Sequence, residues 1–240
     1  LTSFPTVLWL LKGYKELHVN VPDVIRTNTV QVKSGVVSWT RKMVLKDTRF
    51  YLLVPAMVST SMITTAFFFH HLNIAEAKQW DARWITGNYL LYAGSTTVAM
   101  LTAGSLIDRF SAKLVIQYTM IPLALAALTI GIAEHYLWVL LYMILLGAHV
   151  GFSHTTASAL LPELYGVEHL GSIKSMVGAA AVLSSAIGPV LIGMLIDRGV
   201  PILTICIFIA IFVLTVNLLL IIALRMKPAL VALTSNQKKD

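Results

Sequence analysis

The chain alternates between long apolar stretches and short polar segments. Six of the apolar stretches contain no Asp, Glu, Lys or Arg, and each is at least 20 residues long. The hydrocarbon core of a bilayer is about 30 Å thick, so a helix needs roughly 20 apolar residues to cross it. Strands of a membrane barrel would alternate apolar and polar residues, which these stretches do not. The pattern predicts an all-α integral membrane protein with six transmembrane helices, at 50–69, 85–107, 114–133, 136–161, 176–196 and 200–224.

The amino-acid composition supports lipid as the solvent of this chain. Hydrophobic residues make up 57% and charged residues only 12%, whereas a soluble domain carries about a quarter charged residues. The single cysteine, Cys206, lies within an apolar stretch and offers neither a disulfide nor a metal cluster. We expect no catalytic residue, no metal and no cofactor, and the lipid bilayer is the first expected partner.

The segments outside the six stretches suggest how the chain is divided. Residues 1–11 are apolar but too short to span, so we expect them to be the end of an earlier transmembrane helix. The polar residues 12–48 are expected to form a cytoplasmic loop with one short interfacial helix near 38–45. A six-helix region at 49–227 and a cytoplasmic tail at 228–240 complete the division. The first residue is leucine and no signal peptide is expected, so we interpret the chain as the C-terminal part of a longer protein.

Lysine and arginine predict the orientation of the helices. If 12–48 is cytoplasmic, fifteen of the 18 basic residues lie on that side, and only Lys78, Arg83 and Arg198 lie outside. This asymmetry follows the positive-inside rule and places the C-terminus in the cytoplasm. The net charge of +7 is therefore a topology signal. Because the basic residues are scattered among loops, nucleic acid is not an expected partner.

One hexapeptide occurs twice with a single difference. "GSLIDR" occupies 104–109 and ends the second predicted helix, and "GMLIDR" occupies 193–198 and ends the fifth, on the opposite side of the membrane. Two three-helix units related by inversion would produce this pattern, and inverted three-plus-three repeats are a known transporter architecture. The alternative is coincidence, because Leu and Ile are abundant in the chain. We interpret the repeat as internal symmetry.

The stretch around the first hexapeptide resembles the signature loop of the major facilitator superfamily, which reads Gly-x-Leu-Ala-Asp-Arg-x-Gly-Arg-Lys. Ser111 stands in place of the second glycine, and Ala112 in place of an arginine. The words "LKDTRFYLLVPA" and "ELYGVEHLGSIKS" also resemble a bacterial branch loosely related to monocarboxylate carriers. The matching positions are Gly104, Leu106, Asp108, Arg109 and Lys113.

The resemblance implies half of a twelve-helix bundle. The six predicted spans would be helices 7 to 12 of a secondary transporter that moves a small solute, such as an organic acid, by alternating access. The partners it implies are an N-terminal six-helix half of the same protein and a small-molecule substrate. The implied location is the bacterial inner membrane.

The signature loop is the expected gate. Gly104 would let two helices approach closely. Asp108 would accept hydrogen bonds from the exposed N–H groups of a neighbouring helix N-terminus, where the helix dipole favours an anion. Arg109 and Lys113 would face lipid phosphates or the same network. The alternative is that Asp108 and Arg109 only cap and anchor their helix, which is the role we expect for Asp197 and Arg198.

Polar residues inside the spans are the candidates for the transport pathway. His149, near the middle of the fourth span, shares a helix face with Ser153, and His154 shares one with Ser158. An ionisable residue inside the membrane is a functional candidate by default, although a neutral packing histidine is the alternative. The resemblance places helices 7 and 10 along the central cavity. The hydroxyls of Thr60 and Thr64 on helix 7 would line it or bond back to their own helix, and Asn88 near the outer end of helix 8 is a further candidate.

Other polar and small residues are assigned to packing. His70 and His71 are expected to form an exposed pair at the outer end. The remaining assignments are helix contacts or a hinge, at Gly147, Gly151, Gly188 and Pro189.

Two further functions remain as alternatives. No predicted span contains Asp, Glu, Lys or Arg, which favours an efflux pump for apolar compounds as the second transporter reading. A membrane-embedded enzyme with a histidine-bound metal is an alternative of another class, but His149 and His154 point about 140° apart on a helix and do not easily share one metal.

Overall fold

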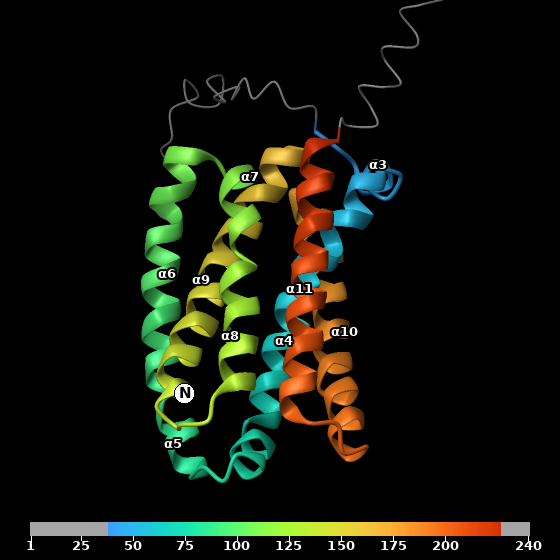
Figure 1. Ribbon diagram of the computed structural model, residues 1–240. Coiled ribbons are helices and arrows are strands. Elements are labelled where there is room, and N and C mark those ends of the chain that lie inside the picture. The colour runs from blue at the N-terminus through green and yellow to red at the C-terminus, as the bar shows by residue number, and fades with distance from the viewer. Residues whose placement is uncertain (1–37, 227–240) are drawn as a thin grey trace, which may run out of the picture. The chain divides into compact units, whose positions relative to one another are not determined.

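The computed structural model describes residues 38–226 (Figure 1). The expected helix end at 1–11, most of the loop at 12–48 and the tail at 228–240 lie outside the described residues. The elements, in chain order, are α3 (Arg41–Val44), α4 (Thr48–Ala77), α5 (Ala82–Gly87), α6 (Tyr89–Phe110), α7 (Ala112–Val115), the 3-10 helix η2 (Ile116–Tyr118), α8 (Ile121–Ile132), α9 (Trp138–Tyr165), α10 (Leu170–Asp197) and α11 (Ile202–Arg225).

All six predicted transmembrane helices are confirmed. Each is long and apolar enough to cross a bilayer: α4, α5 with α6, α7 with α8, α9, α10 and α11. The third span is interrupted by η2, just before Pro122 near the start of α8, because proline lacks the N–H that would continue the helical ladder. We call the end of the bundle that carries α3 and α7 the α3 side, and the opposite end the α5 side (Figure 1).

The packing of the six spans has the symmetry of an inverted repeat. Helix α9 packs against α6 and α8, helix α4 packs against α10 and α11, and α8 packs against α11. Exchanging α4 with α9, α6 with α10 and α8 with α11 reproduces the same set of contacts. The fold is therefore two three-helix units of opposite orientation, as the repeated hexapeptide predicts.

Small residues bring the paired helices together. A methyl group added at Gly147 or Gly151 of α9 would lie 2.5 Å from the carbonyl oxygen of Tyr92 or Thr96 on α6. In the symmetry-related contact between α10 and α4, a methyl group at Gly188 would collide with the carbonyl of Met62. These backbones touch because glycine has no side chain to separate them.

The segment before α4 fastens the α3 side. This segment contains α3, which lies inside the range 38–45 where a short helix is expected. The Trp39 N–H donates to the carbonyl of Tyr165, at the end of α9, at 2.9 Å. The buried Asp47 caps α4 and accepts two hydrogen bonds from the Arg49 Nε, at 3.3 and 3.0 Å. A charge-assisted pair of this kind compensates the desolvation of both groups. The start of α4 is therefore tied to the end of α9.

Candidate gating loop and transport pathway

The signature loop forms a sharp turn between α6 and the third span. Helix α6 ends at Phe110, and the next residue, Ser111, has φ 74° and ψ 152°. Only glycine adopts this backbone region without strain, because a Cβ collides with the adjacent peptide groups. The turn explains why the superfamily motif has glycine at this position. Ser111 is exposed.

A carboxylate that the sequence analysis did not single out holds the other end of this turn. The Ala112 N–H, at the start of the third span, donates to Glu163 Oε2 at 3.0 Å. The Lys113 ammonium lies 3.9 Å from Glu163 Oε1. An anion at a helix N-terminus binds the unpaired N–H groups and the positive end of the dipole. Glu163, near the end of α9, therefore has the role that the sequence suggested for Asp108.

The predicted gating residues are divided by this arrangement. Lys113 joins Glu163, whereas Asp108 is exposed and makes no hydrogen bond or ion pair within residues 38–226. The Arg109 guanidinium lies 5.1 Å from the ring centre of Phe110. A methyl group at Gly104 would find no atom within 4 Å. The close helix contact expected at Gly104 is therefore not made inside the described bundle.

His149 lies deep in the bundle between α9 and the third span. Its Nδ1 is 2.7 Å from the carbonyl oxygen of Thr119 and 3.2 Å from Ser153 Oγ, and the residue is fully buried. A carbonyl oxygen only accepts, so Nδ1 carries the hydrogen. The buried Nε2 has no hydrogen-bond partner among the described residues. The sequence predicts His149 in the pathway. In the structure its ring packs against the backbone where the third span is interrupted, and the pathway role stays a prediction.

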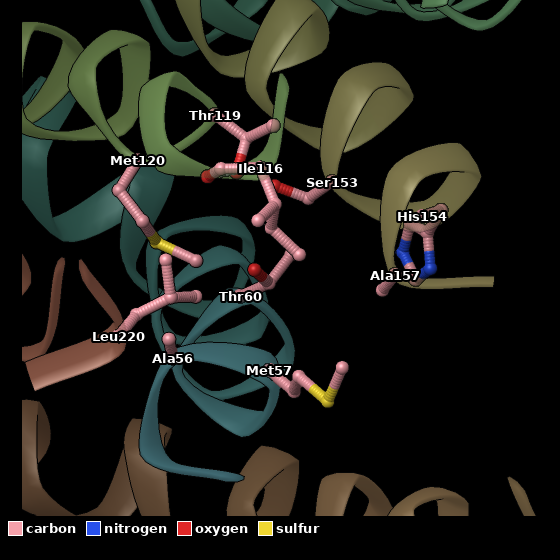
Figure 2. A pocket seen from close by; sticks show the side chains of 10 residues that line it. All are labelled: Ala56, Met57, Thr60, Ile116, Thr119, Met120, Ser153, His154, Ala157 and Leu220. Atoms are coloured by element: carbon pink, nitrogen blue, oxygen red, sulfur yellow. Dashed lines mark hydrogen bonds between the residues drawn. The ribbon is translucent and has the colours of Figure 1, made fainter. Parts of the chain in front are cut away.

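A small cavity lies beside this histidine. Its volume is about 40 Å³, enough for a water molecule. Figure 2 shows the Thr60 and Ser153 hydroxyls on opposite sides of Ile116, with the His154 ring beside Ala157. The lining residues come from α4, α9, α11 and the interrupted third span: Ala56, Met57, Thr60, Ile116, Thr119, Met120, Ser153, His154, Ala157 and Leu220.

The hydroxyls of α4 divide into two kinds. Ser59 Oγ donates to the Ala56 carbonyl at 2.9 Å, which is the local bond expected of a packing serine. The hydroxyls of Thr60 and Thr64 are buried and have no partner among the described residues. A buried hydroxyl without a partner is costly, so Thr60, which lines the cavity, is the better candidate for contact with a solute.

Two polar groups on the α5 side can be compared with their predicted roles. Asn88, between α5 and α6, donates to the Trp84 carbonyl at 2.7 Å and does not line the small cavity beside His149, and its pathway role stays a prediction. His71 was expected to be exposed, and this is wrong. The ring is buried, with Tyr89 Oη 2.9 Å from Nδ1 and Tyr142 Oη 2.7 Å from Nε2, so it joins three spans.

His70 and the predicted hinge meet in the α4–α10 contact. His70 Nε2 lies 2.9 Å from the Pro189 carbonyl oxygen, directly after Gly188. Because the carbonyl accepts, this ring nitrogen donates. The bond ties α4 to α10 at the proline inside α10, which has no N–H to donate to the helical ladder.

The described residues contain no obvious metal centre. Within residues 38–226, no group of three His, Cys, Asp or Glu side chains lies close enough to hold a metal ion. No observation in that part of the chain therefore favours the metal-enzyme alternative.

Comparison with known proteins agrees with the fold and with the loop. A search of curated proteins gives no match. The family model described as the Major Facilitator Superfamily matches residues 50–239, which include all six spans and the signature loop. This multi-pass membrane protein is a membrane transporter, and the chain belongs to the major facilitator superfamily.

Proposed function

We propose that these six helices are the C-terminal half of a twelve-helix secondary transporter that moves a small organic acid by alternating access. The inverted repeat supports this proposal, because such repeats bind solutes at the interface between their units. The uncovered side chains of α6 and α10 support it as well. Gly94 and Gly104 on α6, and Gly171 and Gly178 on α10, have no atom within 4 Å of an added methyl group. These open positions fit close contact with helices of a second half.

The observation that carries the proposed mechanism is the arrangement of carboxylates at the signature loop. Glu163 neutralises Lys113 and binds the Ala112 N–H, so the loop is anchored on its own half. Asp108 is exposed near the same turn and has no partner among the described residues. In the proposed cycle, Asp108 accepts hydrogen bonds from the other half when the α3 side is closed and loses them when it opens. The bond stabilises one state relative to the other, which is what shifts a two-state equilibrium.

The proposed orientation places the α3 side in the cytoplasm of a bacterial cell, with the protein in the inner membrane. The positive-inside distribution of Lys and Arg supports this assignment. Cysteines introduced singly at the exposed positions Ser172 and Asp81, in a Cys206→Ser background, test it. An impermeant maleimide should label the Asp81 position in intact cells and the Ser172 position only after permeabilisation. The reverse labelling would overturn the orientation.

Reconstitution tests the transport function itself. The purified complete carrier in liposomes should accumulate a labelled organic acid by counterflow when the lumen is preloaded with the same compound. Empty liposomes and a carrier cross-linked across the α3 side are the controls. Absence of counterflow for every solute tested, in a folded preparation, would contradict the proposal.

An efflux pump for apolar compounds is a second candidate function. Helix α4 has no charged residue at positions 50–75, and α9 has none at positions 138–162. Uncharged walls suit an apolar solute. Export of a lipophilic dye from energised vesicles, combined with no exchange of carboxylates, would favour this candidate.

A further inference from the structure

A cluster of a lysine, a serine and a histidine lies across the uncovered side of α9 and α10, outside the signature loop. The Lys174 ammonium, from the second turn of α10, donates to Ser158 Oγ on α9 at 2.8 Å. His154 lies one turn before Ser158 on the same helix face. All three side chains are exposed in the six-helix bundle. The cluster therefore faces the region where a second half would pack.

The direction of the Lys174 side chain is unusual for a lysine at a helix end. Lys174 is four residues from the start of α10, and Ser158 is seven residues from the end of α9 on the same side of the bundle. At about 1.5 Å per residue, Ser158 lies roughly 10 Å from its helix end and Lys174 roughly 6 Å from its own. The ammonium thus points deeper into the bundle. A lysine that only anchors a helix extends its charge toward the interface.

The charge of this cluster has no counterion in the described part of the chain. The ion pairs found there are Arg49 with Asp47 and Lys113 with Glu163. Lys174 instead donates to a neutral hydroxyl. Once a second half covers this side, the Lys174 charge would lie away from bulk water, where an opposite charge stabilises it best. This arrangement therefore fits an anion that binds and leaves.

The neighbouring cavity provides an apolar wall beside this cluster. His154 is at the cavity's edge with Met57, Ala157 and Thr60 (Figure 2). The site thus combines three possible hydrogen-bond donors with apolar and hydroxyl-bearing neighbours. A small molecule with one anionic group and a short carbon chain matches this combination.

We propose that Lys174, Ser158 and His154 form a subsite that binds the carboxylate of a small organic acid. The carboxylate replaces the Ser158 oxygen as the acceptor for the Lys174 ammonium, and the freed hydroxyl donates to the carboxylate. His154 donates a ring N–H to the second oxygen. This inference rests on the proposed transport function and locates the residues that bind its substrate. It assigns an anion site to this half. In the orientation argument above, Lys174 is only one of the fifteen basic residues on the cytoplasmic side.

Two solutes of the same shape test the charge requirement. The purified complete carrier is heated in detergent with lactate or with lactamide, which keeps the hydroxyl and carbon chain but has no charge. Acetate, succinate, citrate and benzoate complete the panel. At least one carboxylate should raise the unfolding temperature, because a ligand that binds only the folded state stabilises it. Lactamide should not.

Three variants identify the residue responsible. Lys174→Met should weaken carboxylate binding by about tenfold or more, as expected when one partner of a hydrogen-bonded charge pair is removed. Lys174→Arg should retain most of the binding. Arg225→Gln removes one exposed positive charge from the same side of the bundle, at the end of α11, and should leave carboxylate binding unchanged.

The possible outcomes separate the subsite from the transport function. Equal carboxylate binding by the wild-type protein and Lys174→Met would overturn the subsite. A carrier that exports a lipophilic dye but is stabilised by no carboxylate in the panel would also overturn it while leaving transport intact. A folded carrier that moves neither carboxylates nor dye would overturn the transport function instead. Retained binding by Lys174→Arg, with Lys174→Met equally well folded, supports the subsite, because binding then follows the positive charge and not the folding of the protein.

Discussion

The two copies of the hexapeptide have almost the same sequence and very different surroundings. The first copy, at 104–109, lies within α6, which continues to Phe110 before the chain turns at Ser111. The second, at 193–198, extends one residue past the end of α10 at Asp197, and its turn is made by Gly199 with φ 72°. In the second copy the Gly199 and Val200 N–H groups donate to Ile196 and Leu195, which is the pattern of a glycine-ended helix.

The glycines that begin the two copies differ as well. A methyl group at Gly193 would lie 3.5 Å from the His70 ring, which also binds the Pro189 carbonyl. A methyl group at Gly104 would meet nothing within 4 Å. The second copy is thus packed by its own half, whereas the first is left open. The same short sequence can therefore form a helix end that is packed within its own half in one place and an exposed surface in another.

The largest difference should appear when the aspartate of each copy is replaced. In the complete carrier, Asp108→Asn should lower the initial transport rate by about tenfold to a hundredfold. The reason is that a charge-assisted hydrogen bond to the other half, of about 1.5–3 kcal/mol, is lost in one gating state. Asp197→Asn, which removes the same charge from the packed copy, is the control and should stay within about twofold of wild type by the same arithmetic.

Uptake must be compared at equal protein content in the membrane. Equal losses for Asp108→Asn and Asp197→Asn would show that the two copies do not differ in function. Normal transport by Asp108→Asn would contradict the proposed gating role of this residue.

The next effect concerns the anchor that only the first copy possesses. Glu163→Gln keeps an acceptor for the Ala112 N–H but removes the negative charge beside Lys113 and the helix N-terminus. An anion at a helix N-terminus contributes about 0.3–1 kcal/mol, and an exposed ion pair adds little. A loss of about two- to fivefold in transport rate is therefore expected, smaller than for Asp108→Asn. A larger loss for Glu163→Gln would make Glu163 the principal gating carboxylate.

The six spans could be predicted from the sequence because each is apolar along its whole length. That property does not depend on which helix packs against which. The role of Glu163 could not be predicted, because it arises where the end of α9 meets the start of the third span. A lone carboxylate near the end of an apolar stretch is otherwise typical of an interfacial residue. The burial of His71 could not be predicted for the same reason, because its two tyrosine partners come from other spans.

The hydroxyls of α4 are hard to predict for a related reason, because the rotation of the helix about its axis decides which of them faces a cavity. Ser59 and Thr60 are adjacent in the sequence, yet Ser59 bonds to its own helix and Thr60 has no partner among the described residues and lines the cavity. Composition identifies the hydroxyl-rich segment but not which hydroxyl faces a cavity. The pair Lys174 and Ser158 likewise depends on a contact between two helices.

A smaller effect is expected at the turn that follows the packed copy. Gly199→Ala places a Cβ on a residue with φ 72°. The left-handed conformation costs a non-glycine residue about 1–2 kcal/mol, partly offset by the lower entropy of the unfolded alanine chain. The variant should therefore unfold at a lower temperature in detergent. An unchanged unfolding temperature would mean that the chain at Gly199 relaxes to another conformation.

The smallest effect, of the opposite sign, is expected at the turn that follows the open copy. Ser111 holds a backbone conformation that costs about 1–3 kcal/mol in a residue with a Cβ. Glycine removes this strain but loses about 0.5–1 kcal/mol more conformational freedom on folding. Ser111→Gly should therefore stabilise the protein by about 1 kcal/mol in net terms and raise the unfolding temperature in detergent. Ser105→Gly, at an exposed position inside α6, is the matched control and should destabilise by about 0.5–1 kcal/mol because its backbone is helical. If both variants lower the unfolding temperature, the backbone conformation at Ser111 is not strained. The turn after the first hexapeptide then does not differ in strain from the turn after the second.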